Sequence, residues 1–390
     1  MEYPQDVVIV GGARTAHGKF MGKLSGIPAV ELGNVAISAT MKQTGIDSSI
    51  IDEVIMGNVL SAGIGQHPAR QSALRSGIPA VIPALTINKM CGSSMKAIML
   101  AANSIRAKES SVVVAGGMES MSCSPFIVDR AEDGKVSMET PVDSMWNDGL
   151  VDAVNGMTMA QTGNRIAEQF EVTREEADLF AIESHIRAHG AYKRGDFDGY
   201  HIPVEHDNGI LQIDEGIRPN SSLEALAKLK PVFDENGIVT AGNASQISDG
   251  AAACLVMSRE KADELGLKAL ATITGYCAVG IEPADVMSAP IPTVQKLWKM
   301  LGRDGEKDYD LYEHNEAFAS ACLGVMQGLG LKHEKLNVYG GAVAMGHPLG
   351  ASGCRIVLAL IHALRRKGGK RGFATACLGG GMATAIEVEV

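Results

Sequence analysis

The stretch CGSSMKAIMLAANSIRAKESSVVVAGGM, residues 91–118, predicts a helix that leads directly into a buried strand. Apolar residues recur at helical spacing over 93–108, and the valine run that starts at Val112 is typical of a strand covered on both faces. We expect a turn where this strand reaches Gly116 and Gly117. A similar order of glycine-rich entry, helix, strand and Gly-Gly-Met recurs over 346–382, which indicates two related halves.

The region before this stretch shows the same alternation. Residues 7–10 form an apolar run, VVIV, that Gly11 and Gly12 are expected to end, and residues 54–59 form a second strand-like run. A helical pattern over 31–44 lies between them. Strands and helices that alternate in this way predict a layered α/β architecture.

The middle of the chain has a different texture. From 118 to 243 it consists of polar turns, methionine-rich loops and short helices, with one long amphipathic helix expected over 174–194. The α/β alternation resumes at about residue 251 and continues to the C-terminus. We therefore interpret the middle segment as an insertion into an α/β protein.

Composition argues against several classes of function. The chain has 390 residues, enough for two or three domains, and its formal net charge of −10 disfavours a nucleic-acid partner. The basic residues at 365–367 suit the end of a helix. Without an apolar run of eighteen residues or the basic start of a signal peptide, a cytoplasmic protein with no membrane span is expected. The seven scattered cysteines are expected to be reduced thiols.

Cys91 is the first candidate catalytic residue. It follows a strand-like run, 84–87, and directly precedes the helix expected over 93–108. At a helix N-terminus the macrodipole and free backbone N–H groups favour a thiolate, so we expect its pKa to lie below the free value of about 8.5. A buried cysteine with no chemical role is the alternative for this residue alone.

His347 is the second candidate. It lies in a glycine-rich run, 340–353, just before an apolar helix. A phosphate-binding loop would carry Lys and then Ser or Thr at this place, whereas the chain has His347 and Pro348, so nucleotide binding is disfavoured. A histidine held between glycine and proline at a helix entry suits a general base for a nearby thiol.

Cys377 and Asn315 give two further signals. Cys377 ends a strand-like run, and the three glycines at 379–381 leave backbone N–H groups open to a developing oxyanion. A tight turn beside a buried cysteine is the plainer account. Asn315 precedes Glu-Ala-Phe and an apolar helical pattern, where it either caps the helix or holds a water near a thiol.

These motifs together resemble the thiolase family. The family's four catalytic motifs are matched in order and spacing at Cys91, Asn315, His347 and Cys377. The stretches GGMESM at 116–121 and TAGNAS at 240–245 match as well, and the resemblance extends from about residue 7 to the C-terminus.

The resemblance implies a thiolase-like five-layered αβαβα fold with two similar halves and an inserted loop domain. It implies an N-terminal half at 1–118 plus 244–270, a loop domain at 119–243 for CoA binding and oligomer contacts, and a C-terminal half at 271–390. It also implies a homotetramer, assembled as a dimer of dimers.

The resemblance implies an acyltransferase that condenses two acetyl-CoA to acetoacetyl-CoA and CoA, or cleaves the product, without a metal or other cofactor. Cys91 is implied to be the nucleophile, activated by His347, and Cys377 the acid and base. A water on Asn315 is implied to form one oxyanion site with His347. The backbone N–H groups of Cys91 and Gly379 are implied to form the other.

Contacts with CoA are implied for further residues. Arg218 and Ser245 match positions that touch CoA in the family, and the implied pantetheine tunnel is lined by Phe233, Met159, Ala241 and Phe318. Thr158 stands where many acetoacetyl-CoA thiolases have histidine. This departure leaves chain length open, so a degradative 3-ketoacyl-CoA thiolase for longer chains is the alternative.

Other functions fit the sequence less well. A decarboxylating condensing enzyme would carry a second histidine in the role of Asn315, and a non-catalytic acyl-CoA binding protein would lack a thiol. A nicotinamide dehydrogenase would need GxGxxG spacing, which Gly11-Gly12 does not begin. His185 and His189 have zinc-site spacing, but no glutamate follows His185 and the flanking pattern is that of a solvated helix face.

Overall fold

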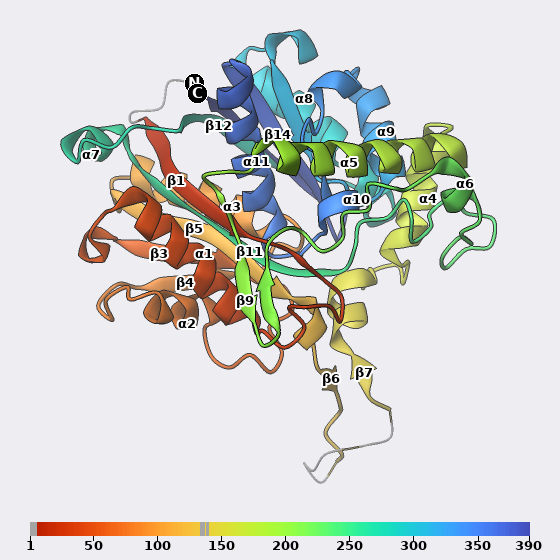
Figure 1. Ribbon diagram of the computed structural model, residues 1–390, viewed down its shortest axis with the longest axis horizontal. Coiled ribbons are helices and arrows are strands. Elements are labelled where there is room, and N and C mark those ends of the chain that lie inside the picture. The colour runs from red at the N-terminus through yellow and green to blue at the C-terminus, as the bar shows by residue number, and fades with distance from the viewer. Residues whose placement is uncertain (1–5, 133–136, 138–139) are drawn as a thin grey trace.

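A long mixed sheet runs through the whole molecule (Figure 1). The computed structural model describes residues 6–132, 137 and 140–390. The strands follow one another in the order β13 (Leu311–His314), β14 (Arg371–Leu378), β15 (Met382–Glu389), β12 (Ala271–Gly280), β1 (Val7–Thr15), β11 (Ser248–Ser258), β5 (Val112–Ser120), β3 (Glu53–Gly57) and β4 (Ala84–Ile87). The short strands β2 (Gly18–Lys19) and β8 (His201–Ile202) pair with β11 and β1.

The sheet consists of two similar halves with a narrow junction. β1 pairs with β12 through only two residue pairs, Val8 with Thr272 and Ile9 with Ala271. On one side of this junction β3 runs parallel to β5, and on the other side β13 runs parallel to β14. The internal repeat predicted from the glycine-rich helix and strand units therefore corresponds to equivalent places in the two halves.

Helices complete the five layers that the resemblance implied. The outer helices of the first half are α1 (Ala29–Thr44) and α2 (Pro68–Arg75), the middle layer is α3 (Ser93–Arg106) and α11 (Ser352–Lys367), and the outer helices of the second half are α8 (Pro290–Leu301) and α9 (Ala319–Leu329). Strand β5 shows the layering in its side chains, which alternate between two faces. Val113 and Ala115 join the core around α3 and α11, while Val112 and Val114 join the core beneath α1.

Two glycine pairs that were expected to end strands lie inside them. Gly116 and Gly117 belong to β5, so the turn predicted there is wrong. A side chain on Gly117 would overlap the carbonyl oxygen of Gly350, which explains why glycine is needed without a turn. Gly11 and Gly12 likewise continue β1, where α1 and Leu358 come too close for a Cβ atom. Glycine marks close backbone packing at both places.

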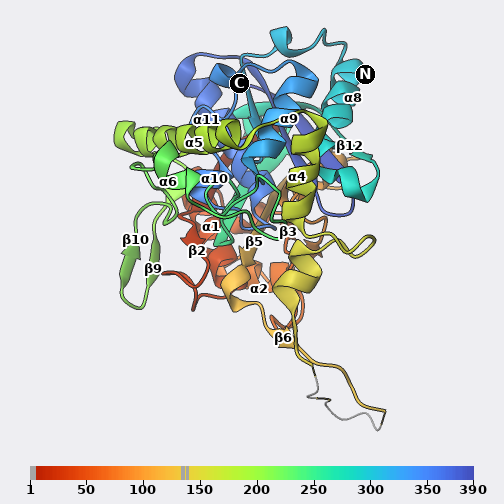
Figure 2. The ribbon, with the colours of Figure 1, turned by 90° about the vertical axis from the view of Figure 1, so that its right-hand side faces the viewer.

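The segment between β5 and β11 lies beside the C-terminal half. Its helices are α4 (Met159–Gln169), α5 (Arg174–Arg194) and α6 (Leu223–Ala227), and its hairpins are β6 (Phe126–Ile127) with β7 (Val142–Asp143) and β9 (Val204–His206) with β10 (Gly209–Leu211). Thr158 and Thr173 start α4 and α5 with capping boxes. Figure 2 shows α4 and α5 beside α9, which both helices contact.

The remaining α-helices of the described residues are short. They are α7 (Arg259–Glu264) and α10 (Ala342–Met345). Arg365, Arg366 and Lys367 occupy the last turn of α11, as their sequence position predicted. Within the described residues, no helix has the length and apolar character needed to cross a membrane.

Candidate active site

Cys91 lies at the junction between β4 and α3, as predicted. The helix that follows begins at Ser93, and Gly92 is its N-cap residue. A Cβ atom on Gly92 would collide with Leu378, so this position must be glycine for β14 to come close. Close approach of the two halves at this point brings Cys91 next to the end of β14.

The expected low pKa of Cys91 is wrong for the free protein. Burial raises the pKa of the thiol to about 11, although hydrogen bonds from the backbone N–H groups of Gly379 and Cys91 act in the opposite direction. Loss of solvation outweighs the favourable position at the helix start. The same contacts show that the two N–H groups implied to form an oxyanion site converge on the sulfur of Cys91.

His347 lies in the connection between α10 and α11. Its backbone N–H donates to the carbonyl oxygen of Gln246 at 3.0 Å and to Oγ of Ser248 at 3.2 Å. Gly346 has a φ of 95° and packs against Ser248, so no other residue fits there without strain. Burial, and then the positive charge of Arg355, lower the pKa of His347 to about 3. The imidazole is therefore neutral at physiological pH.

Asn315 lies against the imidazole of His347. Its Nδ2 atom is 3.3 Å from Nε2 of His347, and its Oδ1 atom accepts a hydrogen bond from Arg355 at 3.2 Å. The alternative in which Asn315 caps the following helix is wrong, because α9 begins at Ala319 after Phe318. Asn315 is instead fully buried just after β13.

Cys377 lies near the end of β14, as predicted, and is buried. Its Sγ atom is 3.6 Å from the sulfur of Met287. Burial, followed by the neighbouring Cys91, raises the pKa of Cys377 well above its ordinary value. Both thiols are therefore protonated in the free protein.

Cys91, His347, Cys377 and Gly379 line one cavity of about 50 Å³. Four residues of the segment between β5 and β11 line it as well: Gly149, Leu150, Met159 and Ser245. Three of the four predicted catalytic side chains thus meet in this cavity, and Asn315 reaches it through His347. We refer to it as the catalytic cavity after that prediction.

A second cavity of about 130 Å³ adjoins the catalytic cavity. The two share the lining residues Leu150, Met159, Ser245, Phe318, His347 and Leu349. Its lining is mostly apolar and includes Phe233, which is 55% exposed and packs edge-on against Trp146. We refer to it as the entrance cavity. Met159, Ser245, Phe233 and Phe318, which were predicted to bind CoA, all line it.

Arg218 and Ala241 lie outside both cavities, on the exposed surface. The backbone N–H of Arg218 donates to Nδ1 of His185 at 3.1 Å. The interpretation of His185 as part of a solvated helix face is wrong, because it is 3% exposed. The zinc site that its spacing from His189 would allow was disfavoured from the sequence, and in the structure His185 holds the loop of Arg218.

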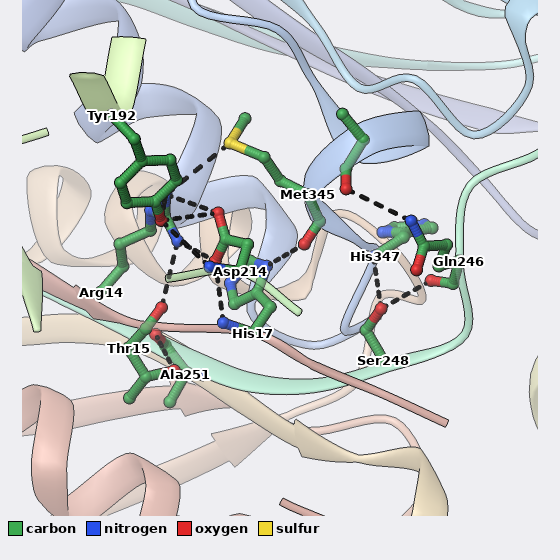
Figure 3. A network of polar contacts seen from close by, with 11 residues as sticks. Arg14, Thr15, His17, Tyr192, Asp214, Gln246, Ser248, Ala251, Met345 and His347 are labelled. Atoms are coloured by element: carbon green, nitrogen blue, oxygen red, sulfur yellow. Dashed lines mark hydrogen bonds and ion pairs between the residues drawn. The ribbon is translucent and has the colours of Figure 1, made fainter. Parts of the chain in front are cut away.

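Sequence reasoning missed the side chains that support His347 from the N-terminal half (Figure 3). The ring of His17 donates to the carbonyl oxygen of Met345 at 3.1 Å, two residues before His347. Gln246 donates to the carbonyl oxygens of Val343 and Ala344, each at 3.2 Å. No local motif marks His17 or Gln246, since their partners lie about a hundred residues or more away.

Family models match almost the entire chain. The N-terminal domain of thiolase matches residues 7–260, and the C-terminal domain of thiolase matches residues 267–390. The chain belongs to the thiolase family. Thiolases are acyltransferases, so this protein is an enzyme of that class.

Individual thiolases are similar to this chain over almost their full length. The acetyl-CoA acetyltransferase of Cupriavidus necator is 47% identical over 390 residues, which cover 98% of this chain and 99% of the relative. The crystal structure of human mitochondrial 3-ketoacyl-CoA thiolase in complex with CoA is 39% identical, with a TM-score of 0.96, and the match covers 100% and 99% of the two chains. The Bacillus anthracis acetyl-CoA acetyltransferase is 38% identical, with a TM-score of 0.95, over 99% and 98%.

Proposed function

We propose that this thiolase catalyses the reversible Claisen condensation of two acetyl-CoA to acetoacetyl-CoA and CoA. The observation that carries the proposal is that Cys91, Cys377 and His347 line one cavity of about 50 Å³. A single water needs roughly 10–15 Å³, so this cavity has room for a short acyl group. The acetyl-CoA acetyltransferase of Cupriavidus necator supports the choice of acetyl groups.

In the first half-reaction Cys91 is the nucleophile. His347 takes the thiol proton while the sulfur attacks the thioester carbonyl of acetyl-CoA. The tetrahedral intermediate then expels CoA as a thiol, which receives the proton from His347. The product is an acetyl group on Cys91. Since thiol and imidazole are both neutral in the free protein, the ion pair forms only when the substrate stabilises it.

In the second half-reaction Cys377 first gives its proton to His347, which lines the same cavity, and then acts as base in its thiolate form. It removes a proton from the methyl group of a second acetyl-CoA, and the resulting carbanion attacks the carbonyl of the acetylated Cys91. The bond to the sulfur breaks, acetoacetyl-CoA leaves, and His347 gives its proton to Cys91, while Cys377 keeps the proton taken from the methyl group. In the cleavage direction the same thiol protonates the departing enolate.

Two oxyanion sites stabilise the charges of these steps. The N–H groups of Cys91 and Gly379, which meet at the sulfur, bind the oxygen of the acyl group carried there. His347 and a water held by Asn315 bind the thioester oxygen of the second acetyl-CoA, whose enolate is formed beside Cys377. The contact between Asn315 and His347 supports this arrangement.

The entrance cavity suits the pantetheine arm of CoA. Its apolar lining, with Met159 and Phe318 near the catalytic cavity and Phe233 towards the surface, fits a narrow uncharged chain. Arg218 on the exposed surface is then placed for the nucleotide end, where the arginine would pair with phosphate. Ala241, which was implied to line the pantetheine tunnel, is not part of the lining of the entrance cavity. We assign these contacts to a loop domain at 119–243, between an N-terminal half at 1–118 plus 244–270 and a C-terminal half at 271–390.

The proposal extends to the setting of the enzyme. We propose a cytoplasmic homotetramer that contributes to fatty acid metabolism and uses only CoA thioesters and CoA, with no further cofactor. The family resemblance supports the tetramer, and the reaction itself supports a place in the making or breaking of acyl chains. Sedimentation of the purified enzyme tests the assembly.

A longer 3-ketoacyl-CoA substrate is the second candidate. A further cavity of about 400 Å³ adjoins the catalytic cavity, and the two share Gly149, Met159 and Gly379. Its wall includes Ala153 and Val154. An acyl chain held on Cys91 could extend into this space. The name of the human structure, 3-ketoacyl-CoA thiolase, is in keeping with such a substrate.

Intact-protein mass spectrometry with acetyl-CoA tests the two thiols. The wild-type enzyme and Cys377→Ala are expected to gain one acetyl group, while Cys91→Ala gains none. Cys377→Ala is also expected to lose condensation. A stable acetyl adduct on Cys91→Ala, or normal condensation by Cys377→Ala, would refute the corresponding role. Exchange of the exposed Cys123 for serine is the matched control.

A further inference from the structure

Arg355 lies behind Asn315 and His347, buried in the first turn of α11. Its side chain is only 1% exposed. The Nη2 atom donates to Oδ1 of Asn315 at 3.2 Å, and the nearest carboxylate oxygen, on Glu313, is 3.9 Å from Nη1. A buried guanidinium with so few short contacts is costly compared with an apolar side chain of similar size. A role other than stability would explain this residue.

The guanidinium fixes the orientation of the Asn315 amide. Arginine can only donate hydrogen bonds, so the amide oxygen of Asn315 must face Arg355. The NH2 group of Asn315 then faces Nε2 of His347, 3.3 Å away. That nitrogen must therefore accept a hydrogen bond.

The hydrogen bonds on the Nδ1 side of the His347 ring indicate the same tautomer, with a lone pair on Nε2. Oγ of Ser352 donates its single proton to the carbonyl oxygen of Pro348 at 2.9 Å. Nδ1 of His347 is 2.6 Å from this Oγ and must supply the proton between them. His347 thus carries its proton on Nδ1 and a lone pair on Nε2. The hydrogen bonds therefore form one chain in which each group donates to the next, from Arg355 through Asn315, His347 and Ser352 to the carbonyl oxygen of Pro348.

We propose that Arg355 is a positioning residue that holds His347 neutral, and Cys91 as a thiol, until a thioester enters. A proton on Nε2 of His347 would face the NH2 group of Asn315. A free asparagine would relieve this conflict by turning its amide and offering oxygen. Arg355 opposes that turn, so the ion pair between Cys91 and His347 is unfavourable without substrate. This inference rests on the proposed function of the site.

Electrostatics acts in the same direction. Burial and then the charge of Arg355 lower the pKa of His347. Other ionisable groups surround the pair of His347 and Arg355: they are Cys91, Cys377, His17, Arg14, Asp214, Glu313 and Glu316. The carboxylates among them favour the charge on Arg355. An uncharged side chain in place of Arg355 would no longer hold the amide oxygen of Asn315, so the amide could turn.

The test is the pH dependence of Cys91 alkylation by iodoacetamide in the full-length enzyme without substrate. Peptide mass spectrometry reads Cys91 separately from the other cysteines. In Arg355→Met the apparent pKa of alkylation is expected to fall by about one unit, which at neutral pH is a roughly tenfold faster reaction because only the thiolate reacts. Arg355→Lys keeps a charge and a donor and is expected to stay close to the wild-type profile.

Asn315→Asp provides a second route if Arg355→Met does not fold. Its carboxylate offers oxygen to His347 whatever Arg355 does, so the alkylation profile should again move to lower pH. A wild-type profile in Arg355→Met or in Asn315→Asp would overturn the inference. The readout needs no turnover. An enzyme that alkylates as expected but does not condense acetyl-CoA would therefore contradict the proposed function and not the role of Arg355.

Discussion

Asp214 holds both terminal nitrogens of the Arg14 guanidinium, at 2.7 and 2.9 Å, from a position 200 residues away. Both side chains are at most 1% exposed. Oδ1 of Asp214 also accepts the backbone N–H of His17 at 2.8 Å, and the ring of His17 supports Met345. The pair therefore connects β1 to the catalytic loop of the other half (Figure 3).

We predict that Asp214→Asn lowers the free energy of unfolding by about 3 to 5 kcal/mol, because it leaves the charge of Arg14 buried without its partner. Chemical denaturation measures the loss. Arg194→Gln is a matched control, since it removes an exposed arginine from its pair with Asp196 and should cost less than about 1 kcal/mol. Equal losses in the two variants would contradict the prediction.

The pair of Asp214 and Arg14 also makes the free energy of unfolding depend on pH in the acid range. Burial would raise the pKa of Asp214, but Arg14 opposes it and holds the pKa well below its ordinary range. A carboxyl group with a depressed pKa stabilises the fold above its unfolded pKa of about 3.9, and this contribution is lost as pH falls below that value. The melting temperature of the wild type should therefore fall more steeply than that of Asp214→Asn between pH 5 and pH 3.

Close packing at Gly117 should be intolerant of a single methyl group. Gly117→Ala places a Cβ atom against the carbonyl oxygen of Gly350 and close to the side chain of Ser94. We expect a loss of about 1 to 3 kcal/mol on chemical denaturation. Gly26→Ala is the control, because no atom lies near its Cβ position and its backbone is not left-handed. Wild-type stability of Gly117→Ala would contradict the prediction, because it would show that β5 and the backbone at Gly350 can move apart.

Oxidation should inactivate the enzyme through the thiols of Cys91 and Cys377. Cys91 and Cys377 line the same cavity, so a disulfide between them or a sulfenic acid on Cys91 would block acyl transfer. Burial keeps Cys91 protonated up to a pKa of about 11, so inactivation by peroxide should be faster at pH 9 than at pH 7. Peptide mapping without reductant identifies the product. Unchanged activity with no mass shift at either pH would refute the prediction.

The cavity beside Gly149 should decide chain length. Ala153→Trp is expected to fill part of its volume of about 400 Å³ and to lower kcat/KM for eight-carbon 3-ketoacyl-CoA at least tenfold, with little change for acetoacetyl-CoA. CoA-dependent cleavage of a chain-length panel measures both. If the wild type cleaves only the four-carbon substrate, the second candidate function fails and the variant should have no effect.

Much of the fold follows from the sequence because its signals are local. The helix expected over 174–194 is α5, and Cys91 was correctly placed between a strand and a helix. The errors in the predicted strands concern glycine, which can occur at a turn or where two segments of backbone pack closely together. At Gly117 only the position of Gly350 distinguishes the two, and at Gly116 only the backbone of Ala252 in β11 does so; both positions depend on the assembled fold.

The site was predicted less completely, since burial and distant partners cannot be read from a motif. The helix start at Cys91 suggested a low pKa, yet the covering of the thiol by the other half raises it. Asn315 and His347 were identified from their motifs, whereas Arg355 gave no signal beyond its place in an apolar helix. Its importance appears only when its partner Asn315 lies beside it.

The apolar lining of the entrance cavity has a consequence for product choice. An acyl-cysteine is a thioester, and water would hydrolyse it if water reached the carbon in the right orientation. The entrance cavity is lined by Phe318, Met159 and Leu349 and offers few hydrogen bonds to water. When the pantetheine arm of a CoA thioester fills it, still less room is left for water. The apolar entrance cavity thus favours transfer of the acyl group over hydrolysis of the acyl-cysteine.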